Sequence, residues 1–242
     1  MQFTTSWDDG HPLDLRLADL LAHHGFQATF YVPNRNQEGL PVLSNAQLCT
    51  LGSGFEIGSH TLDHCYANRV PPAEWTRQVR EGKQALENAL GHSVAGFCYP
   101  GGKVNPQAIE SVKAAGFHYA RTVVNLHLEG GNNRFLIPTT LQFYPHGRAV
   151  IARNWLRSGQ WANRWPATVQ ALSASDHQRQ LMRLLEAALK RDGVFHLWGH
   201  SWELERHALW APLDSFLRSA AQLVPNEARV INARLNSARA GA

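Results

Sequence analysis

Apolar and polar positions along the chain alternate between two kinds of segment. Short apolar runs rich in β-branched and aromatic residues are followed by longer segments in which apolar residues recur every three or four positions. The short runs predict strands at 2–6, 28–32, 55–58, 94–99, 118–123, 136–143, 194–198 and 229–231. This alternation is typical of an α/β fold with a parallel sheet.

The longer periodic segments predict helices between these strands. They are expected at 14–24, 71–91, 105–116, 176–190 and 205–223. Gly25, Gly91 and Gly116 mark the ends of the first three helices, since glycine readily takes the left-handed conformation that follows a helix. With no linker rich in Gly, Pro or Ser, the pattern favours a single domain over residues 1–242 and a closed or nearly closed (β/α) barrel.

One stretch, 144–172, shows little periodicity and carries Trp155, Trp161 and Trp165. We expect a long loop here, acting as an insertion or lid rich in arginine and tryptophan. The rings either pin the loop onto the barrel or form a wall on which a sugar can stack. No acidic residue occurs between residues 129 and 176, whereas five arginines do: Arg134, Arg148, Arg153, Arg157 and Arg164. These arginines could bind an anionic substrate or nucleic acid, or they could simply be solvated.

Composition narrows the class of protein further. The 242 residues are 44% hydrophobic and 17% charged, which excludes a disordered chain. No run of about 18 apolar residues occurs, so we expect no membrane span, and the first residues lack the features of an export signal, so we expect a cytoplasmic protein. The three cysteines form no CxxC pair and are expected to be small buried hydrophobes.

Unusual polar residues cluster just after the predicted strands. Asp8 and Asp9 follow the first strand, His60 and His64 the third, and His200 the run 194–198. In parallel barrels the loops at the carboxyl ends of the strands converge on one face, which carries the active site. We therefore expect these side chains to meet.

The residue types in these loops suggest a divalent metal. Two imidazoles four residues apart, His60 and His64, together with one carboxylate make a three-ligand set with vacant positions for water. Of the adjacent Asp8 and Asp9, one could bind the metal while the other handles a proton, although Asp-Asp-Gly is also an ordinary turn. A histidine after 194–198 could act as a general acid, and His196 and Trp198 share a strand face with His200. His196 also fits the interpretation of a buried, satisfied core residue.

Taken in order, these motifs resemble a known family. Ser6-Trp7-Asp8-Asp9-Gly10, His60-Thr61-Leu62-Asp63-His64, Tyr99-Pro100-Gly101-Gly102 and the late His200 are similar to the polysaccharide deacetylase family, also called the NodB-homology domain or carbohydrate esterase family 4. The resemblance spans residues 4 to about 203. It implies a distorted (β/α) barrel of about seven strands and metal-dependent removal of acyl groups, usually acetyl from amino sugars.

The resemblance also implies a role for each matching position. It makes Asp9, His60 and His64 the metal ligands, Asp8 the base and His200 the acid. The loop at Tyr99, Pro100 and Gly101 would line the substrate site, with the Gly101 N–H holding the oxyanion. The expected cofactor is one divalent ion, Zn²⁺ in the first instance, with Co, Ni, Mn or Fe as alternatives.

This chain departs from the family pattern near the base. The arginine that usually precedes the proline by two residues is Cys98 here. We predict that Arg121, leaving a neighbouring strand, supplies the missing cation to Asp8. Gly101 replaces the usual aromatic residue, which would widen the mouth of the site and disfavour chitin-like polymers. Trp202, close to His200, is a further supporting candidate.

The leading hypothesis is a metal-dependent deacetylase acting on an N-acylated amino sugar or a related small N-acyl compound, with an anionic substrate as one option. A ureide- or cyclic-amide-opening hydrolase on the same scaffold is the alternative among enzymes. A non-catalytic module that binds an anionic glycan or nucleic acid is the alternative from another class, although we do not expect nucleic acid as a partner. The sequence does not specify an oligomeric state.

Overall fold

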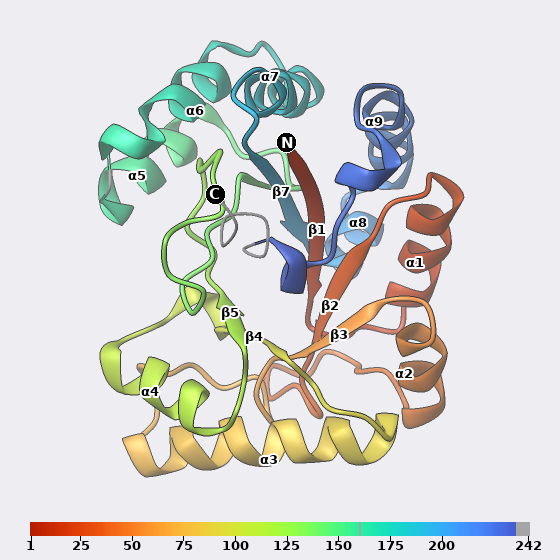
Figure 1. Ribbon diagram of the computed structural model, residues 1–242, viewed down its shortest axis with the longest axis vertical. Helices are drawn as coiled ribbons and strands as arrows, with labels where there is room; N and C mark the ends of the chain where they lie inside the picture. The colour runs from red at the N-terminus through yellow and green to blue at the C-terminus, as the bar shows by residue number, and fades with distance from the viewer. Residues whose placement is uncertain (160, 236–242) are drawn as a thin grey trace.

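Seven parallel strands form one curled sheet at the centre of the molecule (Figure 1). The computed structural model describes residues 1–159 and 161–235. The strands are β1 Gln2–Asp8, β2 Ala28–Val32, β3 Glu56–Ser59, β4 Gly96–Cys98, β5 Tyr119–Arg121, β6 Leu141–Gln142 and β7 Val194–Gly199. Their order is β5-β4-β3-β2-β1-β7-β6, and each neighbouring pair is parallel. The predicted α/β architecture with seven parallel strands is confirmed.

The sheet curls because one segment reaches both of its edges. Ile137 forms a parallel bridge with Arg121 at the end of β5, and a few residues later Leu141 of β6 pairs with Leu197 of β7. The result is a half-barrel with an inner and an outer face. The carboxyl ends of the strands meet at one rim of this half-barrel, as expected for the fold.

Helices cover the outer face of the sheet (Figure 1). They are α1 Asp14–His23, α2 Asn45–Gly52, α3 Pro72–Leu90, α4 Pro106–Ala114, α5 Arg148–Ser158, α6 Trp161–Ser173, α7 His177–Lys190, α8 Ser201–Arg206 and α9 Trp210–Leu223. Alternate strand residues such as Phe3, Trp7 and Phe30 pack outward into the main core, whereas Tyr31 and Cys98 belong to a smaller inner cluster. Among the described residues, no helix is both long and apolar enough to cross a bilayer.

Two predicted elements are wrong in detail. Residues 229–231 form no strand, since Arg229 makes only an isolated bridge with Phe3 and its guanidinium donates to main-chain carbonyls such as that of Val224. The expected helix at 205–223 is two helices, α8 and α9, because Ala208 takes a positive φ of 53° between them. The short helix α2 was not predicted, although Ser44 and Gln47 form a capping box at its start.

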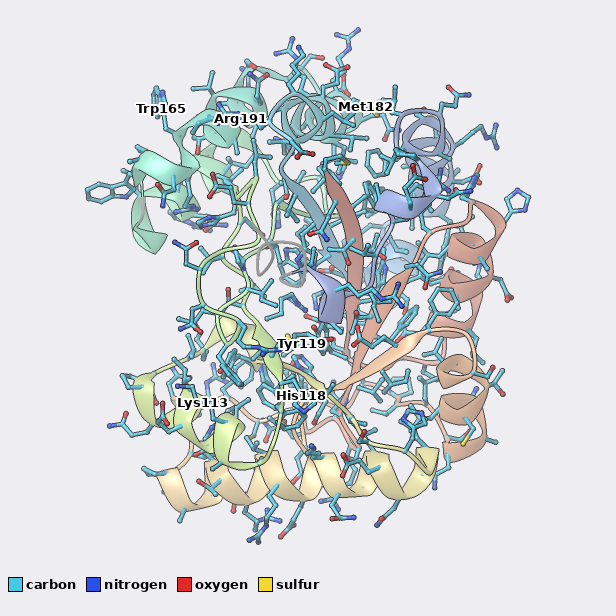
Figure 2. All side chains as sticks on the ribbon, viewed as in Figure 1. Lys113, His118, Tyr119, Trp165, Met182 and Arg191 are labelled. Carbon is cyan, nitrogen blue, oxygen red and sulfur yellow. The ribbon has the colours of Figure 1, made fainter. Side chains whose placement is uncertain are left out.

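The expected long loop at 144–172 is instead largely helical. Helices α5 and α6 form there, held by the buried guanidinium of Arg164, which donates to the carbonyls of Asn125, Trp155 and Gly159. Because a polar side chain holds these helices through hydrogen bonds to main-chain carbonyls, the apolar periodicity that normally reveals a helix is weak. Trp161 and Trp165 remain 55% and 56% exposed, and Figure 2 shows Trp165 pointing away from the molecule.

Helix α3 approaches the loop after β3 unusually closely. A Cβ placed on Gly82 would lie 2.7 Å from the main-chain nitrogen of Leu62 and 2.7 Å from the carbonyl carbon of Thr61. These backbone atoms lie between His60 and His64. Because Gly82 has no side chain, helix α3 can pack closely against this loop and support it.

We predict that Gly82→Ala destabilises the fold, although alanine is the better helix former. Intrinsic propensity alone would stabilise the protein by about 0.5–1 kcal/mol. The clash with fixed backbone should instead cost about 1–3 kcal/mol of unfolding free energy, measured by urea denaturation. Arg80→Ala, at an exposed position of the same helix, should change stability by less than about 0.5 kcal/mol; a Gly82→Ala protein as stable as this control would contradict the prediction.

Candidate functional site

The end of β1 directs two adjacent carboxylates to different partners. Asp8 is the last residue of the strand and contacts Arg121 on the inner face of the sheet. Asp9 has a positive φ of 77°, a conformation that non-glycine residues seldom adopt. This sharp turn points Asp9 toward His60 and His64 in the loop after β3. The two aspartates can therefore have different roles.

Asp9, His60 and His64 converge on a common point. Asp9 Oδ1 lies 3.2 Å from His64 Nε2 and 3.8 Å from His60 Nε2, and one ligand atom from each of the three side chains falls within 4.8 Å of the others. The residues are 4%, 1% and 5% exposed, respectively. One carboxylate oxygen and two imidazole nitrogens brought together in this way can hold a divalent cation.

The protonation states of this group suit metal binding. His60 Nδ1 donates to the carbonyl of Cys98 at 2.8 Å, which leaves the Nε2 lone pair facing Asp9. Burial lowers the pKa of His60 to about 4, so the ring is neutral at pH 7. Burial alone would raise the pKa of Asp9, but the hydrogen bond with His64 and the nearby histidines hold it well below its usual range. The donor set therefore fits a divalent metal ion.

Trp202 and His200 approach Asp9 from the start of α8. Trp202 Nε1 donates to Asp9 Oδ2 at 2.8 Å, on the oxygen that does not face His64. His200 Nε2 lies 3.9 Å from the same oxygen. His200 Nδ1 donates to Glu203 Oε2 at 2.7 Å. Burial opposes a charged ring, but Glu203 and Asp9 raise the pKa of His200 to about 9, which favours the protonated ring at neutral pH.

The predicted contact between Arg121 and Asp8 is present. Arg121 Nη2 donates to Asp8 Oδ1, and the arginine is fully buried. Its guanidinium lies over the rings of Tyr31 and Trp198, 5.1 and 5.2 Å from their centroids. Trp198 is fixed in turn by donating to Asn125 Oδ1 at 2.8 Å. A cation from β5 thus holds Asp8 beside Cys98, whose Sγ lies 3.7 Å from Asp8 Oδ2.

A second possible ligand group shares residues with the first. One atom each from Asp8, His60 and Cys98 also falls within 4.8 Å of the others. Arg121 already places a positive charge on Asp8, and a cation bound there would be repelled by the guanidinium. Beside Asp9 the neighbouring cation is His200, which can lose its proton whereas an arginine cannot, so the group of Asp9, His60 and His64 is the better candidate.

The loop that follows β4 is shaped by glycine. Gly101 has a φ of 58°, and a Cβ on it would lie 2.5 Å from the ring of Tyr66. Tyr66 therefore fills space that a larger residue at position 101 would need, and its ring also contacts that of His64, with centroids 5.5 Å apart. The expectation that Gly101 simply widens the mouth is wrong, because an aromatic ring from another loop lies beside it.

Some predicted residues lie outside the group. His196 contacts Ser6 Oγ at 2.8 Å and the Pro138 carbonyl at 3.1 Å, so it is a satisfied residue of the inner face. Tyr99 is buried and packs edge-on against Phe97. Pro100 is buried at the start of the short turn that contains Gly101.

The sequence reasoning missed two neighbours of the site, Glu203 and Tyr66. Glu203 lies three residues after His200, the spacing at which side chains meet on a helix, so a signal was present. It also accepts from Gln142 Nε2 at 3.0 Å. Tyr66 donates to Glu38, a contact between loops that no spacing in the sequence indicates.

Comparisons with known proteins agree with the resemblance. Residues 3–120 match the family model described as polysaccharide deacetylase. A peptidoglycan-N-acetylglucosamine deacetylase of Bacillus cereus is 28% identical over 102 residues, 42% of this chain and 46% of the relative. A chitin deacetylase of a Pestalotiopsis species is 27% identical over 128 residues, 52% of this chain and 42% of the relative. The chain thus spans less than half the length of these curated relatives.

Solved structures share the fold at low sequence identity. The chitin deacetylase of Colletotrichum lindemuthianum has a TM-score of 0.56 at 17% identity, covering 90% of this chain and 81% of that one. This likeness extends the shared architecture well past residue 120, the end of the family match. It supports the half-barrel over nearly the whole chain.

We predict that Trp202→Phe weakens metal binding without unfolding the protein. Removing the indole N–H leaves Asp9 Oδ2 without this hydrogen bond, and losing such a supporting contact typically lowers metal affinity about 10–100-fold. Competition with a chelating dye would measure the Zn²⁺ affinity.

Trp210→Phe is the matched control, because Trp210 also donates through Nε1 to a carboxylate, that of Glu205. It should leave metal affinity unchanged. Equal affinities in the two variants would show that Trp202 does not position Asp9.

Proposed function

We propose that this chain, whose residues 3–120 belong to the polysaccharide deacetylase family, is a metal-dependent hydrolase that removes an acyl group, typically acetyl, from the nitrogen of an amino sugar. The curated relatives are named as deacetylases of N-acetylglucosamine in peptidoglycan and of chitin, and these names support this substrate class. Acyl removal from carbohydrate is the chemistry that the family shares. The metal, the sugar and the cytoplasmic location expected from the sequence remain predictions.

The observation that carries the proposal is the convergence of Asp9, His60 and His64 next to an independently held carboxylate, Asp8. A divalent cation held by the first three would supply a Lewis acid that polarises the acyl carbonyl and a water molecule. Two acidic residues adjacent in sequence thus receive separate roles, metal ligand and base.

Asp8 is suited to accept the proton of the attacking water. Arg121 binds one of its oxygens, and the other lies 3.7 Å from the weakly donating thiol of Cys98. The guanidinium fixes the carboxylate and offsets its charge in a buried site. Base catalysis by a positioned carboxylate typically contributes about 10²–10⁴ in rate.

His200 is suited to protonate the departing amine. Its Nδ1 is bound to Glu203, and its Nε2 faces the Asp9 group. Glu203 orients the ring and favours its charged form, so a proton is available at Nε2. The N–H of Gly101 is the proposed donor to the oxyanion, since Gly101 is exposed in the short turn after β4.

We expect the metal-loaded protein to release acetate from N-acetylglucosamine oligosaccharides, as followed by an enzymatic acetate assay. Asp8→Asn should lower kcat about 10²–10⁴-fold by removing the base, with metal content unchanged. Asp63→Asn is the control, because Asp63 is in the same loop as His64 but pairs with Arg35. Ring opening of ureides, or salt-sensitive glycan binding without turnover, would contradict the deacetylase assignment.

We predict that Arg121→Met lowers kcat about tenfold or more, because Asp8 loses its orientation. An unpaired buried carboxylate also costs about 3–5 kcal/mol of stability, so unfolding is measured alongside activity. The double variant Asp8→Asn/Arg121→Met should be more stable than Arg121→Met and no less active than Asp8→Asn. Additive losses of activity in the double variant would show that Arg121 acts independently of Asp8.

A further inference from the structure

A cavity of about 450 Å³ lies beside the connection between β5 and β6. Thr122 and Pro138 line it, whereas the adjacent Arg121 and Ile137 face the inner side of the sheet. Side chains alternate along extended backbone, so the cavity is on the opposite side of this connection from the Asp8–Arg121 pair. Its volume falls in the range of small-molecule sites. In Figure 1 the connection is drawn in green between α4 and the α5–α6 pair.

A buried histidine without a partner lines this cavity. His127 is 7% exposed, and its Nε2 makes no hydrogen bond within the described chain. Burial, together with the charge of Arg164, lowers the pKa of His127 to about 4, so the ring is neutral at pH 7. A neutral imidazole offers one donor and one acceptor, which matches a hydroxyl group. A buried polar atom that is left unpaired in the free protein is a reason to expect a ligand.

The backbone holds His127 in a fixed position. The preceding Leu126 has a φ of 69°, a strained conformation for a leucine. Its N–H donates to the carbonyl of Thr140, and the N–H of His127 donates to that of Thr139. These bonds hold the strained backbone in place, so the fold sets the position from which the His127 side chain projects.

The polar groups around the cavity define a ligand chemistry. Glu129 is the only charged side chain that lines it, and it forms no ion pair or hydrogen bond with other described residues. Asn132 and Asn163 add amide donors and acceptors at the rim. One carboxylate surrounded by amides and a neutral imidazole favours a hydroxylated ligand that carries a single positive charge.

An adjoining cavity of about 280 Å³ limits where that charge can sit. It shares His127, Glu129 and Asn163 with the first and is lined also by Arg191, which Figure 2 labels. The guanidinium would repel a ligand cation. The positive group is therefore expected on the side of Glu129 that faces the larger cavity.

The geometry points to this cavity as a binding site for an amino sugar with a free ammonium group, held by Glu129 through its charge and by His127 through a hydroxyl. The identity of the ligand rests on the proposed function, because removal of an acyl group from an amino sugar produces this ammonium. The cavity would then distinguish sugar units that have been deacylated from those that have not.

Calorimetric titration of the metal-loaded protein with glucosamine and with N-acetylglucosamine tests this assignment. Glucosamine should bind about tenfold more tightly, the effect of one charge-assisted hydrogen bond. Glu129→Gln should bring the two affinities together, and His127→Phe should weaken both. Glu186→Gln, at an exposed position of α7, is the matched control and should change neither. The His127 imidazole NMR signal, assigned by its loss in His127→Phe, should shift on addition of glucosamine.

The same titration with Asp9→Ala separates the cavity from the metal centre, since binding at the cavity should persist. Equal affinities for the two sugars in the unmodified protein, or a preference that survives Glu129→Gln, would overturn the assignment. Failure of the proposed function would look different: glucosamine would still bind through Glu129, but no acetate would be released.

Discussion

Two adjacent carboxylates buried at the end of one strand impose the main constraint on this structure. Asp8 and Asp9 are almost fully enclosed, and buried charges are stable only when opposite charge offsets them. Asp8 receives it from Arg121, and Asp9 faces two imidazoles that could share a cation with it. The curled sheet satisfies this requirement, because it brings β5 and the loop after β3 to the end of β1.

The fold was largely predictable because its signals are local. The β-branched and aromatic residues of β1, β2 and β7 and the amphipathic stripe of α3 are local features, and these elements appear where the sequence indicates. Helices α5 and α6 were not predictable in this way, since a buried arginine that binds main-chain carbonyls replaces much of the usual apolar stripe. The positive φ of Ala208, which divides α8 from α9, has no marker in the residue type.

The site was predictable to the extent that motifs carry it. The spacing of His60 and His64 and the adjacent aspartates identified residues that the structure places together. The contact of Arg121 with Asp8 was predictable because Cys98 stands where the family usually has an arginine, so another cation was needed beside the base. The contact between Tyr66 and Glu38 was not predicted, because it joins two loops that are distant in sequence.

The place of Tyr66 beside Gly101 has a consequence for how proteins of this shape diverge. The ring of Tyr66 fills the space beside Gly101, so the loop after β3 supplies bulk that the loop after β4 lacks. A side chain that one loop lacks can therefore be replaced in space by a ring from another loop. Substrate preference in such proteins should be compared by the volume that side chains occupy in space, since a comparison position by position would record only the glycine.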